Sequence, residues 1–224
     1  MQLRRILLAT IAGLMSITLL TGFTHNKIPG LGSGGGGGGG SWTAIVKDGK
    51  EGLTSLASAT AILLNAQADL ADALGFKQEA ALLRGDAKNL TEKGEDIGGS
   101  DIETAGKNSA SVQKKINDKL MASGELDANT AAAVGSAGKK MIPALGKIVK
   151  GVSILVKVGS SISSAGQPSP TDIGAVNIAA TIPALMPKAA QAVPEVFKTA
   201  NDFRKVAAEK NIAMPEVPAA PGFS

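Results

Sequence analysis

The segment that decides the fold is Lys139–Ser164, which reads KKMIPALGKIVKGVSILVKVGSSISS and is the most apolar stretch after the N-terminal region. Its apolar residues recur at spacings of three and four, the period that places side chains on one face of an α-helix. A second apolar row widens this face beyond what a surface helix needs. We therefore expect a mostly buried helix, with the other helices packed around it. The two rows contain Leu145, Ile148, Val152, Leu155 and Ile162, and Met141, Val149 and Val156.

The same helix carries four lysines on one side, which we call the basic ridge. At about 100° of rotation per residue, the four fall within an arc of roughly 100°. Two partners suit such a ridge: the acidic half of the same fold, or an external anionic surface. The ridge consists of Lys140, Lys147, Lys150 and Lys157.

Charge is unevenly divided along the chain. Residues 41–127 hold fourteen acidic and ten basic residues, whereas residues 128–224 hold five acidic and ten basic residues. No acidic residue lies between Asp127 and Asp172, although five lysines do. We favour pairing between the two halves within one fold, and an anionic partner is the alternative.

Composition favours an all-α fold. Apolar residues make up 44% of the 224-residue chain and aromatic residues only 3%, so the core must be built from Ala, Leu, Ile and Val. This length leaves room for one domain of about 150 to 180 residues beside targeting and linker segments. The chain has no Cys, and His25 is its only histidine, which argues against disulfides, Cys-ligated metals and Cys or His nucleophiles.

Residues 1–23 have the pattern of an export signal. Arg4 and Arg5 precede an apolar run of about fifteen residues, fewer than the roughly twenty that cross a bilayer. The sequence that follows, Leu20-Thr21-Gly22-Phe23, resembles the lipobox of bacterial lipoproteins, in which a Cys at the last position receives the lipid. Phe23 stands at that position here and cannot be lipidated. We expect a signal peptide, with a retained N-terminal anchor as the alternative.

A glycine-rich segment follows the signal. Seven consecutive glycines, Gly34–Gly40, have large backbone freedom and no side chains to bury, so residues 24–41 should form a flexible linker. A phosphate-binding loop would need a preceding strand and a Lys-Ser/Thr signature, which this segment lacks. The α-helical domain should cover residues 42–212, and the prolines after Met214 predict an extended tail over 213–224.

The other apolar series predict a helical bundle of about five or six helices. The first series runs from Trp42 to Leu74 with heptad-like spacing, and the second continues after Gly75, so the two should form a long, antiparallel, coiled-coil-like hairpin. We interpret Thr60 and Gln67, which interrupt the first series, as edge positions. The alternative is that they are core positions that set the register of packing.

Turn and capping signals predict where the helices end. Loops are expected near residue 75 and at 94–99, 124–127 and 164–171. Ser100 and Glu103 form a capping-box pattern at the start of a third helix, and Asp127 or Ser123 should cap the next. The inward residues of the third helix should be Ile102, Ala105, Val112, Ile116 and Leu120.

Prolines predict breaks in the last two helices. Pro143 should kink the central helix or start a new one, because proline removes a backbone donor. A helix beginning near Asp172 meets Pro183 and Pro187, so we expect a separate last helix over about 193–210.

No group of residues predicts catalysis or metal binding. Asp69 and Asp72 lie one helical turn apart, as do Asp48 and Glu51, but no third ligand lies near either pair. The basic half has only three aromatic residues, which argues against nucleic-acid binding. We predict no enzyme activity, no cofactor, no nucleic-acid partner and no small-molecule substrate.

Two functions agree with these observations. The first is an exported α-helical protein of the bacterial envelope, periplasmic or at the surface, with a structural or binding role toward a protein partner. The alternative is a membrane-active protein that docks or inserts its 139–164 helix on anionic lipid, with the basic ridge as the contact. A retained signal segment would anchor either protein to the inner membrane.

Overall fold

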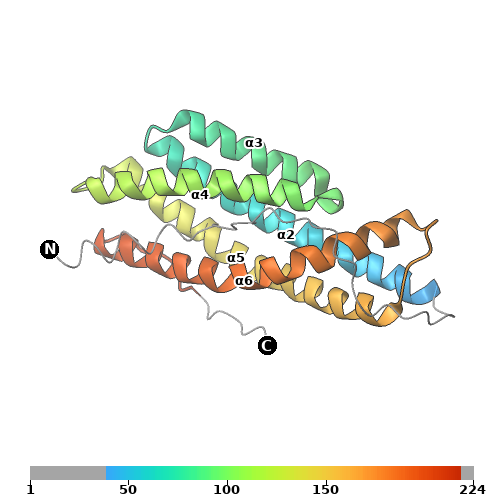
Figure 1. Cartoon of the computed structure of the whole chain (residues 1–224). Coiled ribbons are helices and arrows are strands. Elements are labelled where there is room, and N and C mark those ends of the chain that lie inside the picture. The colour runs from blue at the N-terminus through green and yellow to red at the C-terminus, as the bar shows by residue number, and fades with distance from the viewer. Residues whose placement is uncertain (1–38, 218–224) are drawn as a thin grey trace.

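The computed structural model describes residues 39–217, and this part of the chain is all-α, without a strand. It forms an elongated bundle of helices (Figure 1). The predicted fold class is therefore confirmed. The predicted signal segment and residues 24–38 of the predicted linker lie outside the described residues, as do residues 218–224. The elements are α2 (Gly39–Ala73), α3 (Lys77–Lys93), the short 3-10 helix η1 (Gly94–Asp96), α4 (Gly99–Ala122), α5 (Ala128–Ala165) and α6 (Ile173–Glu209).

Helix α2 is the centre of the bundle, because it packs against every other described helix, and its most extensive contact is with α5. The two helices are antiparallel: Ser55 lies beside Lys147, whereas Asp69, further along α2, lies beside Lys140, earlier in α5. The 139–164 segment is thus one half of a central pair. Its partner α2 has the wider set of neighbours.

The predicted hairpin of α2 and α3 is present and antiparallel. Arg84 of α3 contacts Asp72 near the end of α2, and Glu95 of η1 contacts Lys50 near its beginning. From Lys50 toward the start of α2, the described part of the bundle contains only α2, α5 and α6. Figure 1 shows these three helices extending past α3 and α4 at one end of the bundle. There Gly49 packs against Ile178 of α6.

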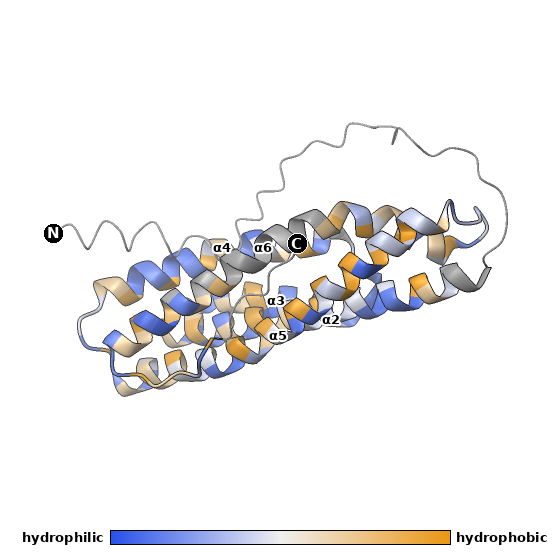
Figure 2. Cartoon of the chain, turned by 90° about the horizontal axis from the view of Figure 1, so that it is seen from below, coloured by the Kyte–Doolittle hydropathy of each residue, from blue (hydrophilic) through white to orange (hydrophobic). Residues whose placement is uncertain are grey.

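The apolar series identify the core correctly. Figure 2 shows hydrophobic and hydrophilic residues mixed along each helix, as expected when one side of a helix is buried. In α5, Leu145, Val152 and Leu155 are buried, while Val149 and Val156 of the second row are only partly buried. All five predicted inward residues of the third helix are buried in α4.

Glycines allow the central pair to approach closely. A Cβ atom on Gly151 of α5 would lie 3.1 Å from the backbone nitrogen of Leu56 and 3.2 Å from the carbonyl oxygen of Gly52, both in α2. The neighbouring backbone cannot move aside as a flexible side chain can. The backbones of α2 and α5 are therefore in contact where most helix pairs are separated by side chains.

A buried row of hydrogen bonds, which we call the polar ladder, joins α2 to α4. Ser109 donates from its hydroxyl to Oε1 of Gln67 at 2.6 Å, and Nε2 of Gln67 donates to Oε1 of Gln113 at 2.8 Å. Nε2 of Gln113 in turn donates to Oδ1 of Asn117 at 2.8 Å. Gln67 is only 1% exposed, so our edge interpretation was wrong for it.

Thr60 was also misplaced at an edge. It is 3% exposed, and its hydroxyl donates to the carbonyl oxygen of Leu56 in the preceding turn at 2.9 Å. A threonine satisfied within its own helix can occupy a core position without a partner from another helix. Thr60 therefore fills core volume, whereas Gln67 links two helices.

The end of α2 and the start of α5 follow the predicted residues. Helix α2 ends in a Schellman motif: Gly75 has φ +86°, and the amide of Phe76 donates to the carbonyl oxygen of Ala71. Asp127 caps α5 by accepting from the amides of Asn129 and Thr130, both at 2.9 Å.

The start of α4 differs from the predicted capping box. Helix α4 begins at Gly99, one residue before Ser100, so Ser100 does not cap it. Instead the carboxylate of Asp101 accepts from the amide of Gly98 at 2.9 Å and from Lys93 at 2.6 Å. Burial alone would raise the pKa of Asp101, but these two donors outweigh it and lower the pKa. Helix α2 likewise begins at Gly39, inside the predicted linker.

The prolines do not break the helices. Pro143 lies inside continuous α5, and α6 runs unbroken past Pro183 and Pro187, so the separate last helix over 193–210 is not found. Both Pro143 and Pro183 are exposed, so a carbonyl oxygen left without its helical donor can be hydrated on that side. Helix α6 bends near the middle of its length (Figure 1), as proline-containing helices do.

Residues 210–217 turn back along the start of α5. Asn211, at φ 57°, reverses the chain after α6, and the amide of Ile212 donates to the carbonyl oxygen of Ala207 at 2.8 Å. Met214 then fills the space that a side chain at Gly138 would need. The ammonium of Lys210 donates to the carbonyl oxygens of the α4–α5 loop, at Ser123 and Gly124.

Candidate anion-binding groove

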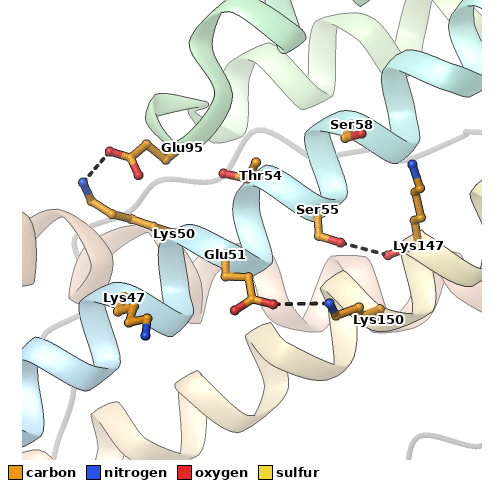
Figure 3. A pocket seen from close by; sticks show the side chains of 9 residues that line it. All are labelled: Lys47, Lys50, Glu51, Thr54, Ser55, Ser58, Glu95, Lys147 and Lys150. Carbon is orange, nitrogen blue, oxygen red and sulfur yellow. Dashed lines mark hydrogen bonds and ion pairs between the residues drawn. The ribbon is translucent and has the colours of Figure 1, made fainter.

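An open groove of about 660 Å³ runs along the exposed face of α2, between η1 on one side and α5 on the other. Figure 3 shows its side chains: α2 lies in the middle, and the lysines of α5 reach toward it from below. The lining contains four lysines, two glutamates and three hydroxyl side chains, with no arginine and no aromatic residue. It is formed by Lys47, Lys50, Glu51, Thr54, Ser55, Ser58, Glu95, Lys147 and Lys150.

The groove follows from the periodicity of α2. Its α2 residues, from Lys47 to Ser58, recur at steps of three, one, three, one and three, which keeps them on one face of the helix. The apolar seam of α2 faces α5 and α3, so this polar stripe is left toward solvent. At about 1.5 Å of rise per residue, the stripe extends over roughly 16 Å.

Two of the four lysines are paired within the groove. Nζ of Lys50 lies 2.6 Å from a carboxylate oxygen of Glu95, and Nζ of Lys150 lies 3.3 Å from one of Glu51. The hydrogen bond that Lys50 donates to Glu95 is the main reason that the pKa of Lys50 is raised above its ordinary value. Lys50 is therefore held firmly in its charged form.

Lys47 and Lys147 have no ion pair with another described residue. The groove therefore has two more positive than negative side chains. The backbone carbonyl of Lys147 accepts a bond from the hydroxyl of Ser55 at 3.4 Å, which joins α5 to α2 beside the groove. Figure 3 shows the Lys47 and Lys147 ammonium groups near opposite ends of the lining.

The basic ridge is exposed as a whole, but only part of it enters the groove. Lys147 and Lys150 line the groove, whereas Lys140 lies earlier in α5, outside the groove, and pairs with Asp69. Lys157 is exposed and lies outside the lining. The expected pairing between the acidic and basic halves thus exists at Lys140 and Lys150.

The residues on the α2 side of the groove were not predicted from the sequence as a binding site. Lys47 and Lys50 were counted with the acidic half, and Glu51 was considered only as a partner of Asp48 in a carboxylate pair. The available signal was the spacing of Lys47, Lys50, Glu51, Thr54, Ser55 and Ser58 on one helical face. That spacing does not show that α5 brings two further lysines beside it.

The carboxylate pair of Asp69 and Asp72 is held by cations from the protein itself. Arg84 contacts Asp69 at 3.3 Å and Asp72 at 3.2 Å, and Lys140 also donates to Asp69. Burial would raise the pKa of Asp69, but the bonds from Lys140 and Arg84 outweigh it, so the pKa is lowered. In residues 39–217 no three acidic or histidine side chains lie close enough together to hold a metal ion.

Comparison of the chain with protein-family models, with curated proteins and with solved structures finds no match. Among the described helices, none has both the length and the apolarity to cross a bilayer.

Proposed function

We propose that the chain is an exported α-helical protein of the bacterial envelope, with a structural or binding role and no catalytic activity. The observation that carries the binding role is the groove. Its unpaired lysines, Lys47 and Lys147, together with the hydroxyl side chains beside them, are suited to holding an anionic group. The proposal of export is supported by the signal-like residues 1–23.

Cell fractionation tests the compartment. A C-terminally tagged precursor should appear in the periplasmic or envelope fraction of a bacterial host, with a mass lower by the signal segment if that segment is cleaved. Replacement of Leu7 and Leu8 by Arg, which interrupts the apolar run, should leave the uncleaved chain in the cytoplasm. A wild-type chain found only in the cytoplasm would contradict export.

The alternative role is docking on anionic lipid. It is favoured by the exposure of all four lysines of the basic ridge along α5. Docking through these lysines is compatible with the fold, whereas insertion of the apolar side of α5 would require it to leave the core, where Val152 and Leu155 are buried. Flotation with vesicles that contain phosphatidylglycerol at low salt tests docking, and the absence of binding would contradict it.

A further inference from the structure

We propose that the groove between α2, η1 and α5 binds an extended, phosphate-bearing polyanion along the line from Lys47 to Lys147. This inference deepens the proposed binding role by naming the class of ligand. It does not depend on the compartment in which the protein acts.

The distribution of charge favours an extended ligand. The ammonium groups of Lys47 and Lys147 lie near opposite ends of the lining (Figure 3), along a stripe of roughly 16 Å. A single small anion would contact only one end. A chain with repeated charges can contact Lys47 and Lys147 together and pass Lys150 between them (Figure 3).

The chemistry of the donors favours phosphate. The cations of the lining are all lysines, which bind phosphate as point charges, and none is an arginine, whose forked guanidinium binds carboxylate and phosphate alike. Lysine ammonium groups and hydroxyls donate in several directions from single atoms, which suits the tetrahedral oxygens of phosphate. Thr54 and Ser58 place two such hydroxyls along the same stripe, whereas the hydroxyl of Ser55 already donates to the carbonyl oxygen of Lys147.

Other polyanions fit less well. Single-stranded nucleic acids are bound through base stacking on aromatic side chains as well as through phosphates, and no aromatic residue lines the groove. The lining lysines are drawn from two helices and face a recess between them. A flat lipid surface would instead be contacted by the outer line of the basic ridge, including Lys140 and Lys157.

The two ion pairs prepare the groove for such a ligand. Glu95 holds Lys50, and Glu51 holds Lys150, so neither lysine has to be ordered when the ligand binds. The same glutamates repel any anion, so a ligand with only one or two charges gains little net attraction from the groove. A polymer with many charges gains enough attraction from the four lysines to bind despite them, and its binding should weaken strongly with added salt.

The test is the binding of inorganic polyphosphate to the purified protein at low salt, measured by calorimetry or fluorescence anisotropy. The variant Lys47→Gln/Lys147→Gln removes the two unpaired charges, and its Kd should rise roughly tenfold or more, since each basic residue near an anionic surface contributes about 1 kcal/mol. The control Lys139→Gln/Lys157→Gln removes the same charge from exposed positions on α5 outside the groove. Its Kd should stay within about twofold of the wild type.

Three further ligands make the result decisive. Orthophosphate should bind far more weakly than polyphosphate, and polygalacturonate, an anionic chain of carboxylates, should bind more weakly as well. Equal binding of polygalacturonate would overturn the assignment to phosphate. Binding to phosphatidylglycerol vesicles without binding to polyphosphate would overturn the groove in favour of lipid docking.

Circular dichroism and thermal unfolding of each variant separate loss of binding from loss of fold. Equal weakening by the groove variant and by the control would show that net charge, and not the groove, attracts the ligand. That result would overturn the inference, while the fractionation experiment would still decide whether the protein is exported.

Discussion

Single residues decide how closely α2 and α5 pack, and Gly151 is the clearest case. Its missing side chain leaves room for the backbone of α2. A Cβ atom at this position would lie 3.1 Å from the backbone nitrogen of Leu56 and 3.2 Å from the carbonyl oxygen of Gly52. Gly146, five residues earlier in the same helix, is exposed and has nothing within 4 Å of the position of a Cβ atom. The two glycines therefore have opposite roles within one helix.

This difference gives a prediction with an internal control. Gly151→Ala should lower stability by about 1 to 3 kcal/mol, because α2 and α5 must separate to admit the methyl group. Gly146→Ala should raise stability by about 0.5 to 1 kcal/mol, because alanine is the better helix former. Urea unfolding of both variants measures the effects, and a stabilised Gly151→Ala variant would contradict the close approach.

The ionisation of Asp69 should make the free energy of unfolding depend on pH in the acid range. The pKa of Asp69 is lowered in the folded state, so its contribution is present above the unfolded value of 3.8 and is lost as the pH falls through the lower, folded value. Asp69→Asn should therefore lower the free energy of unfolding near neutral pH by less than about 1 kcal/mol, because the Asp69 side chain is 39% exposed, and the thermal midpoint should fall with it.

The decisive comparison for Asp69 is between pH values. The difference in midpoint between wild type and Asp69→Asn should shrink as both proteins are titrated from neutral pH to below the folded pKa. A difference that stays constant in acid would show that the substitution acts through packing and not through the charge that Lys140 and Arg84 stabilise.

At the scale of helices, the polar ladder fixes how α4 lies on α2. Gln67→Ala should cost about 1 to 3 kcal/mol, because Ser109 and Gln113 would keep buried polar groups without their partner. Asn65→Ala, on the exposed side of the same helix, should change stability by no more than about 0.5 kcal/mol. Faster amide hydrogen exchange confined to α4 in the Gln67 variant would identify the helix that loosens.

Helix periods and turns were largely predictable from the sequence. Apolar residues three and four apart mark α2 to α6, and glycines such as Gly75 mark the loops, because both depend on local backbone geometry. The polar ladder was not predictable in this way. The spacing of Gln67 is the same at an edge and in the core, and only the position of Ser109, 42 residues later, distinguishes the two.

The prolines show a second limit of local reasoning. Pro143 and Pro183 each remove a backbone donor, which predicts a break when the helix is considered alone. In the bundle both are exposed, and neighbouring helices hold the segments on either side. The groove shows the same limit, since the polar stripe on α2 was visible while its neighbours on α5 were not.

At the scale of the whole molecule, substitutions in α5 should affect stability differently if α5 is part of the bundle core than if it inserts into a membrane. Leu155→Ala should lower stability by about 2 to 4 kcal/mol, because Leu155 is fully buried and its loss leaves a cavity. Lys147→Glu/Lys150→Glu should change stability by less than about 1 kcal/mol, since both side chains are exposed. An unchanged thermal midpoint after Leu155→Ala would remove α5 from the core.

The pairing of α2 with α5 has a consequence for how the protein is made. Ser55 and Lys147 are 92 residues apart, so at about 5 to 20 residues per second the ribosome needs roughly 5 to 20 seconds to supply the main partner of α2. During that interval, among the described elements, only α3, η1 and α4, which precede α5 in the chain, can shield part of the apolar surface of α2. A newly made chain is therefore prone to aggregate until α5 has emerged, and a chaperone that holds it unfolded would protect it through this stage.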